Sequence, residues 1–521
     1  MANYQHRRSH DDRPTAHRRN EDYLTAGPSI FLCLSGGGLR AALFHYGCFK
    51  RLHEVGLLGH VYAISATSGG AISAALLACY QGRSDAEKHI CTYRWAEFET
   101  AFLRMATRGL LERTTFLIIV YGFHMLWIAA AFIRTIGGPV PLSVILLLLE
   151  VALVLHISLG ADLISEKTYR HSYDEQIEAE MLYGERLRPI SPQSLSRTMK
   201  MLFAPSHLRL EAMNAMLFRG GFMRGLPGVP RLYLNTVNLN DGRQKVFGQG
   251  GLADLDSTGC RFLWELETDD ECKYLTLAAA VAASSAIPLF FHPVSIRGRE
   301  KLLGVFVDGG VADNLALSVP KALAVHIHPD RGQRFRPDGG GLMSFQSSTS
   351  YVLIADGSMP LAEKHNRSWS RLLSLKRVTD SMMNQQMTDA ATTALTFARN
   401  ARVPTAIASL QFGMPDHVAD SVPVPANVLR RVRTHLDAFN LQECAVLAYC
   451  GYSLIEQWLR ENPDLLDRYE GARKAKCLEF REILPEAFRK WDADASGVQR
   501  TLRYSNFRFS PVRWIGRKLG W

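Results

Sequence analysis

The chain has 521 residues, of which 47% are hydrophobic and 21% are charged. This length is sufficient for two or three domains, and the composition supplies a large packed core and excludes wholesale disorder. The formal net charge of +10 suits a nucleic acid or an anionic membrane surface, but much of the basic excess lies at the two ends of the chain.

The nine cysteines are scattered and form no C-x-x-C pair. An odd number of dispersed cysteines argues against a metal site or a disulfide framework and is typical of a reducing compartment. Residues 1–27 are basic and lack the apolar core of a secretory signal. We expect these residues to form a disordered, solvated tail.

A glycine-rich turn follows the first apolar run, in the sequence SIFLCLSGGGLRAALFHYG of residues 29–47. Such a turn between a strand and a helix brings backbone N–H groups close to a negative group. From Gly36 to Ala41 it fits the dinucleotide pattern G-x-G-x-x-A. That site needs an acid about 20 residues later, at the end of the second strand. Glu54 instead belongs to the first helix, and the next strand, HVYAIS, ends without an acid, which weakens the nucleotide interpretation. The alternative is an oxyanion formed during a reaction.

The second strand leads into ISATSGGAISAALLACY, where Ser68 precedes Gly69 and Gly70. This is nearly the G-x-S-x-G elbow, which presents a serine hydroxyl on a tight turn at a helix N-terminus. There the next N–H and the helix dipole stabilise developing negative charge. Ala66 replaces the first glycine and adds a Cβ where strand and helix approach. The alternative interpretation is a simple turn of small residues.

Two apolar runs follow, over residues 116–136 and 140–160, each about 20 residues and long enough to cross a bilayer as a helix. The Gly-Gly-Pro break between them allows an antiparallel hairpin. Basic residues flank the outer ends, which places the bulk of the protein on the cytoplasmic side. The alternative is a helical hairpin buried in the core or at a dimer interface, and His124 and Glu150 favour it because ionisable groups are costly in a membrane.

A third motif, GVFVDGGVADNLAL, places Asp308 at the end of an expected strand, before Gly309 and Gly310. A carboxylate fixed there can accept a proton from a serine hydroxyl without a histidine. Asn314 is positioned to brace the loop by hydrogen bonds. By itself the motif is also compatible with an ordinary turn.

A histidine triad or a metal site is less well supported. His326, His328 and His365 follow Asp308 in the chain, but none lies in a distinctive loop motif. The first two alternate along an expected strand and would need further metal ligands that the local sequence does not supply.

The region from residue 423 to 521 is expected to be mostly helical and begins near a pair of prolines. It ends in SNFRFSPVRWIGRKLGW, whose mixed cationic and aromatic residues favour the lipid headgroup zone or, equally, a helix packed on the domain. The region could cover the active site, bind a partner or complete the fold.

Taken together and in this order, the motifs resemble the patatin-like phospholipase family. The likeness lies in SGGGLRAALFHYGCFKRL, SATSGGAISA, RLYLNTVNLNDGRQKVFG, LTLAAAVAASSAIPLFFHPV and VFVDGGVADNLAL. It covers residues 29–80 and 230–320, and leaves the hairpin and the last hundred or so residues outside.

The resemblance implies an α/β fold, a three-layer α/β/α sandwich, with a Ser–Asp dyad. Ser68 would be the nucleophile and Asp308 its base. The expected oxyanion hole consists of Gly36, Gly37, Gly38 and Arg40. The expected supporting residues are Gly69, Gly70, Gly309, Gly310 and Asn314.

The expected organisation is a catalytic domain in two parts, residues 28–100 and 226–422, separated by an insertion over 101–225 that carries the transmembrane hairpin. We expect a membrane-anchored enzyme, with its catalytic domain facing the cytoplasm, that hydrolyses phospholipids or lysophospholipids and, as a second choice, neutral glycerides. The scheme needs no metal or cofactor and no nucleic acid. Membrane lipids would serve as substrate and anchor, and the hairpin offers a surface for oligomerisation.

Three rival functions remain at this level. Ala66 favours a catalytically silent membrane scaffold or sensor. A signal-activated lipase effector, with the C-terminal region reading the signal, would share the same motifs. A nucleotide-dependent oxidoreductase is disfavoured because the ribose-binding acid is missing.

Overall fold

The computed structural model describes residues 30–85, 90–108, 230–249, 251–255, 262–264, 275–288, 291–297, 302–325, 351–358, 405–410, 439–469 and 471–487, with isolated positions between 378 and 436. The expected N-terminal tail, the two apolar runs, the three histidines after Asp308 and the basic–aromatic C-terminus lie outside these residues. Among the helices that are described, none combines the length and the apolar character that crossing a bilayer requires.

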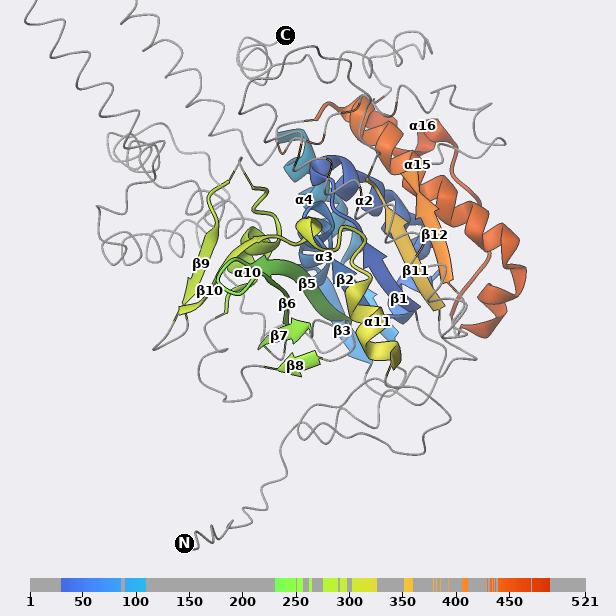
Figure 1. Ribbon diagram of the computed structural model, residues 1–521. Helices are drawn as coiled ribbons and strands as arrows, with labels where there is room; N and C mark the ends of the chain where they lie inside the picture. Colours follow the sequence, from blue (N-terminus) through green and yellow to red (C-terminus); the bar gives the residue numbers. More distant parts are fainter. Residues whose placement is uncertain are drawn as a thin grey trace, which may run out of the picture.

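A mixed sheet forms the centre of the molecule (Figure 1). Its strand order is β12–β11–β1–β2–β5–β6–β7–β8, with β10 beside β5 and β9 beside β10. The strands are β1 (Ile30–Leu34), β2 (Val61–Ala66), β5 (Arg231–Asn238), β6 (Arg243–Gly248), β7 (Gly251–Leu255), β8 (Phe262–Trp264), β9 (Val294–Arg297), β10 (Leu302–Asp308), β11 (Tyr351–Asp356) and β12 (Thr405–Ser409). The expected α/β fold is thus confirmed.

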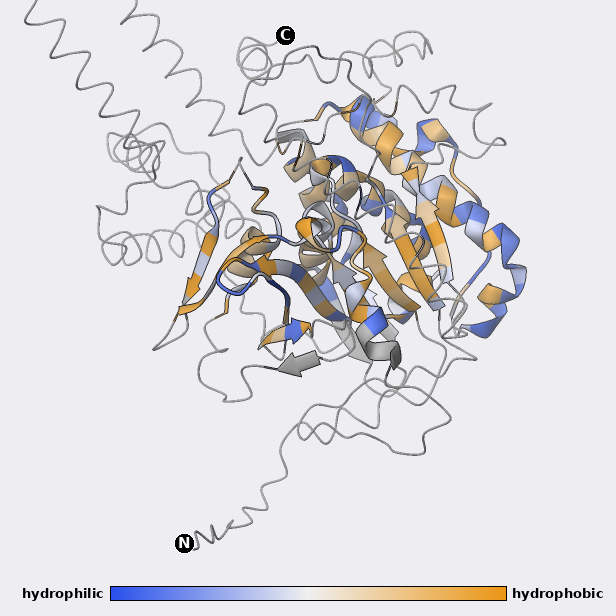
Figure 2. Cartoon of the chain, viewed as in Figure 1, coloured by the Kyte–Doolittle hydropathy of each residue, from blue (hydrophilic) through white to orange (hydrophobic). Residues whose placement is uncertain are grey.

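The sheet changes character at β5. From β12 to β5 neighbouring strands are parallel, whereas β5 to β8 pair antiparallel. All residues of β1 and β11 are buried, as expected for continuous apolar runs covered on both faces of a parallel sheet (Figure 2). The carboxyl ends of β1, β2 and β11 therefore meet at one edge, which is where ligands bind in open α/β sheets.

Seven described helices accompany the sheet: α2 (Gly38–Glu54), α3 (Gly69–Cys79), α4 (Trp95–Arg108), α10 (Leu277–Ser284), α11 (Ser318–Val325), α15 (Leu441–Glu461) and α16 (Phe480–Ile483). A separate antiparallel pair, β3 (Gln81–Asp85) and β4 (Ile90–Tyr93), follows α3. Phe98, Phe102 and Ala106 of α4 are buried in the core. The first segment of the core therefore continues to Arg108, beyond the position near 100 where the insertion was expected to begin.

Helix α15 lies along α2 (Figure 1). A Cβ added at Gly47 would overlap the carbonyl oxygen of Ala448, and one added at Gly451 would overlap that of Phe44. The two backbones are therefore in direct contact, which only glycine at these positions allows. α15 begins with a capping box in which Asn440 and Glu443 bond each other's backbone N–H. This part of the C-terminal region completes the catalytic core.

Candidate active site

The ends of β2 and β10 meet beside β5. Ala66 of β2 pairs with Leu234, and Asp308 of β10 pairs with Thr236. β10 lies on the same edge of β5 as β2, because β6 occupies the other edge from Leu234 to Asn238. The two strand ends are two β5 residues apart, about 7 Å. This register brings together two motifs that are far apart in the sequence.

Ser68 occupies the turn between β2 and α3 with φ 52° and ψ −117°. A positive φ is costly for a residue with a side chain, about 1–3 kcal/mol, and such strain gathers at functional sites. A Cβ at Gly69 would overlap the carbonyl of Gly38, and one at Gly70 would overlap that of Leu34. The turn is therefore pressed against the glycine loop, which explains why small residues follow the serine.

Asp308 is fully buried. Its Oδ1 accepts the N–H of Gly310 at 2.7 Å, while Oδ2 has no regular hydrogen bond within the described part of the chain. Burial raises the pKa of Asp308 to about 6, and interaction with the Ser68 side chain and with the Gly310 N–H opposes that rise. The carboxylate therefore lies against the serine. Its elevated pKa makes it a stronger base than an exposed aspartate.

The glycine loop is held by the segment that follows Asp308. The Gly36 N–H donates to the Asn314 carbonyl at 2.9 Å, and the buried Asn314 Oδ1 lies against Gly36 without a hydrogen bond from any described residue. Gly37 and Gly38 have φ values of 130° and 61°. Within the described residues, the N–H groups of these two glycines have no acceptor. They lie at the N-terminus of α2, where the helix dipole favours an anion.

Arg40 lies in the first turn of α2, and its side chain is engaged by backbone carbonyls of other segments rather than left free to reach into the loop. The guanidinium donates to the carbonyls of Gly357, at 3.4 Å, and Val432, at 3.1 Å. Burial lowers the pKa of Arg40 to about 10, against the opposing attraction of Asp356. The hydrogen bonds thus tie α2 to the loop after β11.

Two serines at the end of α10 brace the elbow, although the sequence motifs did not single them out. Ser284 Oγ accepts the Ser68 N–H at 3.2 Å and donates to the Asn235 carbonyl at 2.7 Å. Ser285 Oγ donates to the Ser68 carbonyl at 3.4 Å. The only signal for this role was the location of both serines within a stretch that resembles the family.

Two other buried or partly buried polar side chains, His45 and Glu54, have structural partners. The His45 ring contacts the Ala355 carbonyl and Ser73 Oγ, and burial lowers its pKa to about 3, which keeps the ring neutral. Glu54, near the position that a ribose would require, accepts hydrogen bonds from Arg51 and Tyr452 at the α2–α15 contact. In the part of the chain that is described, no three His, Cys, Asp or Glu side chains are arranged to hold a metal ion.

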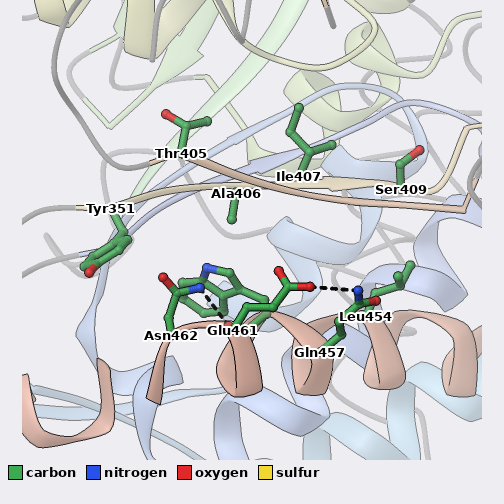
Figure 3. Close-up of a pocket in the computed structure, with 10 residues that line it drawn as sticks. Tyr351, Thr405, Ala406, Ile407, Ser409, Leu454, Gln457, Glu461 and Asn462 are labelled. Carbon is green, nitrogen blue, oxygen red and sulfur yellow. Dashed lines mark hydrogen bonds between the residues drawn. The ribbon is translucent and has the colours of Figure 1, made fainter. Parts of the chain in front are cut away.

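A cavity of about 470 Å³ lies elsewhere, between β12 and α15 (Figure 3). Thr405, Ile407 and Ser409 of β12 line one side, and Leu454, Gln457 and Glu461 of α15 line the other. Its lining includes neither Ser68 nor Asp308. The catalytic motifs therefore belong to a different place in the fold.

The family model for patatin-like phospholipases matches residues 32–320. This match spans the glycine loop, the serine elbow and the aspartate turn, and more than half of the chain. The chain therefore belongs to the patatin-like phospholipase family, and it is an enzyme of the lipid acyl hydrolase class.

Among solved structures, the chain is similar to VipD from Legionella pneumophila, with 14% identity over 84% of this chain and 67% of that chain, at a TM-score of 0.29. It is also similar to human GIVD cytosolic phospholipase A2 in complex with a methyl γ-linolenyl fluorophosphonate inhibitor, with 13% identity over 88% of this chain and 62% of that chain, at a TM-score of 0.36. No curated protein sequence matches the chain.

Proposed function

We propose that this protein hydrolyses ester bonds of phospholipids or lysophospholipids, with Ser68 as nucleophile and Asp308 as its general base. The observation that carries the proposal is the meeting of the β2 and β10 ends, which sets a serine in a strained turn against a buried carboxylate of raised pKa. The family contributes the lipid class of the substrate.

In the proposed reaction, ionised Asp308 accepts the Ser68 hydroxyl proton while Oγ attacks the ester carbonyl. Collapse of the tetrahedral intermediate breaks the ester C–O bond, and the leaving alcohol takes the proton from Asp308. A water molecule, deprotonated by the same carboxylate, then attacks the acyl-serine. Collapse of this second intermediate breaks the bond to Ser68 Oγ, which takes the proton back from Asp308, and the fatty acid leaves. One buried base serves both half-reactions, so no histidine is needed.

We assign the oxyanion hole to the N–H groups of Gly37 and Gly38. The Gly36 N–H is already used to hold Asn314, and the Arg40 guanidinium holds two backbone carbonyls. Gly36 and Arg40 would then support the hole rather than line it with their own donors. Removal of one oxyanion donor typically costs about 3 kcal/mol of activation free energy.

The membrane part of the proposal rests on the sequence between α4 and β5. The two apolar runs, at 116–136 and 140–160, lie in the sequence between the end of α4 at Arg108 and the start of β5 at Arg231. As a transmembrane hairpin they would hold the active site at the bilayer surface, where lipid substrates are concentrated, with the catalytic domain on the cytoplasmic side. The same hairpin could pair with that of a second copy.

The test is fatty-acid release from mixed phospholipid vesicles by the purified protein and by Ser68→Ala. We expect the wild type to release fatty acid and the variant to lose nearly all activity, and the lipid profile then identifies the substrate. Equal release by both proteins would overturn Ser68 as the nucleophile. A wild type that is inert on every phospholipid, lysophospholipid and glyceride tested would favour the silent scaffold.

A further inference from the structure

The end of β2 is tied to the loop after Asp308 by one direct route. Thr67, next to the proposed nucleophile, donates its hydroxyl proton to the Asp313 carbonyl at 3.0 Å. The Asp313 carboxylate in turn accepts the N–H of Ser318 at 2.6 Å, at the start of α11. This route links the serine elbow to the first turn of the helix that follows the proposed base.

A second route connects the same two segments through the sheet. Asn235 Nδ2 donates to Ser65 Oγ at 3.0 Å and to the Ala66 carbonyl at 3.2 Å. Its Oδ1 accepts from Gln244 Nε2 at 3.3 Å. Gln244 Oε1 then accepts the hydroxyl proton of Ser318 at 3.1 Å. Because one route starts at Thr67, the other at Ala66, and both end at Ser318, these hydrogen bonds and the backbone between them form a closed ring next to the elbow.

The donors and acceptors of the ring are consistent with only one orientation of each side-chain amide. A carbonyl oxygen only accepts, so the Ala66 carbonyl fixes the Asn235 amide with its nitrogen toward β2. The Asn235 oxygen then requires the nitrogen of Gln244, and the Gln244 oxygen requires a donor from Ser318. The orientation of both amides is therefore set by a backbone atom two residues before Ser68.

The ring lies largely in the interior, where polar groups are costly. Thr67 and Asn235 are fully buried, Asp313 is 5% exposed and Gln244 is partly buried. Apolar side chains would fill this space without a desolvation cost, whereas a satisfied polar network fixes one arrangement of the segments it joins. The segments joined here are those that carry the proposed nucleophile and base.

We propose that Gln244 is a positioning residue that, through Asn235 and Ser318, holds the Ser68 and Asp308 segments at their reactive separation. The inference rests on the proposed function, since it assigns a role in that same site. Gln244 contacts neither reacting residue by a hydrogen bond of its own. It lies on β6, the strand on the far side of β5 from the dyad.

The test is the rate at which a fluorophosphonate labels Ser68 in Gln244→Leu, measured against pH. In this reaction Oγ forms a bond to phosphorus, fluoride leaves and Asp308 takes the proton, so the rate reports the dyad without any assumption about the lipid. Gln249→Leu is the matched control. Gln249 lies just after β6 and bonds the backbone of Leu232 and Pro230, outside the ring.

We expect Gln244→Leu to slow labelling at pH 8 by at least about tenfold, because small displacements of reacting groups are expensive in rate. The pH midpoint should move upward, since a looser Ser68–Asp308 contact no longer opposes the effect of burial. On a water-soluble ester, kcat should fall while KM stays unchanged. Gln249→Leu should keep the wild-type rate and midpoint even if its thermal stability falls as much.

Ser318 supplies a second and independent variant. Ser318→Ala removes the donor to Gln244, whereas Ser318→Thr keeps a hydroxyl. We expect the alanine variant to lose rate and the threonine variant to retain it. The double variant Ser318→Ala/Gln244→Leu should be no slower than the slower single variant, because both changes break the same link.

Two results would overturn the inference: labelling of Gln244→Leu within twofold of wild type at an unchanged midpoint, or equal slowing in the Gln249→Leu control. Should Gln244→Leu not fold, the Ser318 pair decides, and equal rates for alanine and threonine would reject the ring. Wild-type protein that is not labelled at Ser68 contradicts the proposed function instead.

Discussion

At the scale of single residues, the site depends on side chains to which the sequence alone assigned no role. Ser68 and Asp308 could be found from sequence because each lies in a compact strand–turn pattern. Ser284 could not, since its contact with the Ser68 N–H joins residues more than 200 positions apart. No local spacing encodes a side chain that reaches the backbone of another segment.

Ser284→Ala should destabilise the protein by about 1–3 kcal/mol, because it leaves the buried Ser68 N–H without its acceptor. Urea unfolding of the variant measures this loss. Ser285→Ala is the control, as it removes a longer hydrogen bond to a carbonyl, and its cost should be smaller. Equal stability of Ser284→Ala and wild type would show that the Ser284 contact does not hold the elbow.

Asp308 should make the protein less stable as the pH rises from about 4 to 7. Its folded pKa of about 6 lies above the ordinary value of 3.8, so across this interval the folded state holds a proton that the unfolded state has released. This stabilisation of the folded state is fully present at pH values below the pKa of Asp308 in the unfolded chain, and it is lost as the pH rises through the pKa in the folded protein. The free energy of unfolding should fall by about 3 kcal/mol over this range.

Asp308→Asn removes this pH dependence of the free energy of unfolding. The variant should be more stable than wild type at pH 7, whereas near pH 3.5 the loss of the carboxyl group's titration should change the stability little. Denaturant titrations at the two pH values check the sign. Lower stability of the variant at pH 7 would contradict a raised pKa. Hydrolysis by wild type should increase with pH through the same midpoint, since only the ionised carboxylate accepts the serine proton.

At the scale of elements, the contact between α2 and α15 is the tightest constraint on the core. Gly47→Ala should destabilise the protein by about 1–3 kcal/mol or more, because the new Cβ overlaps the Ala448 backbone. Thermal unfolding measures the change. Gly242→Ala serves as the control. Gly242 lies in a turn with φ 69°, and no atom lies within 4 Å of the added Cβ. This variant should lose only about 1–2 kcal/mol of stability, from backbone strain.

Elements with a strong local signal were predicted well from sequence. β1, β2 and the end of β10 follow from short apolar runs bounded by glycines, and α15 lies in the region that was expected to be mostly helical. The pairing of β5 with β2 and β10 along one edge and with β6 along the other could not be predicted, because strand register depends on partners from distant segments. For the same reason the insertion was expected to begin at residue 101, inside α4, although Phe102 and Ala106 of that helix pack in the core.

At the scale of the whole molecule, the apolar runs between α4 and β5 decide how the proposed enzyme meets its lipid substrate. If these runs cross the membrane as a hairpin, a cysteine at its turn should be reachable only from the side opposite the catalytic domain. The measurement uses sealed vesicles in which the protein is inserted in either orientation, and an impermeant maleimide added outside. The maleimide should label Gly138→Cys only in vesicles whose outer face is opposite the catalytic domain. Labelling of the parent protein, which keeps its native cysteines, is subtracted as background.

Lys476→Cys is the matched control for this topology, because the Lys476 side chain is 76% exposed on the catalytic core. It should be labelled only from the cytoplasmic side. Labelling of both cysteines from the same side would exclude a spanning hairpin and favour a hairpin that packs within the protein or enters only one leaflet.

The central claim is that a buried aspartate activates Ser68 without a histidine. Its most direct test is fatty-acid release from phospholipid vesicles by Asp308→Asn at pH 7, with folding of the same sample checked by its unfolding midpoint. We expect a folded variant, at least as stable as wild type, that has lost nearly all activity. A folded Asp308→Asn variant that releases fatty acid at the wild-type rate would contradict it.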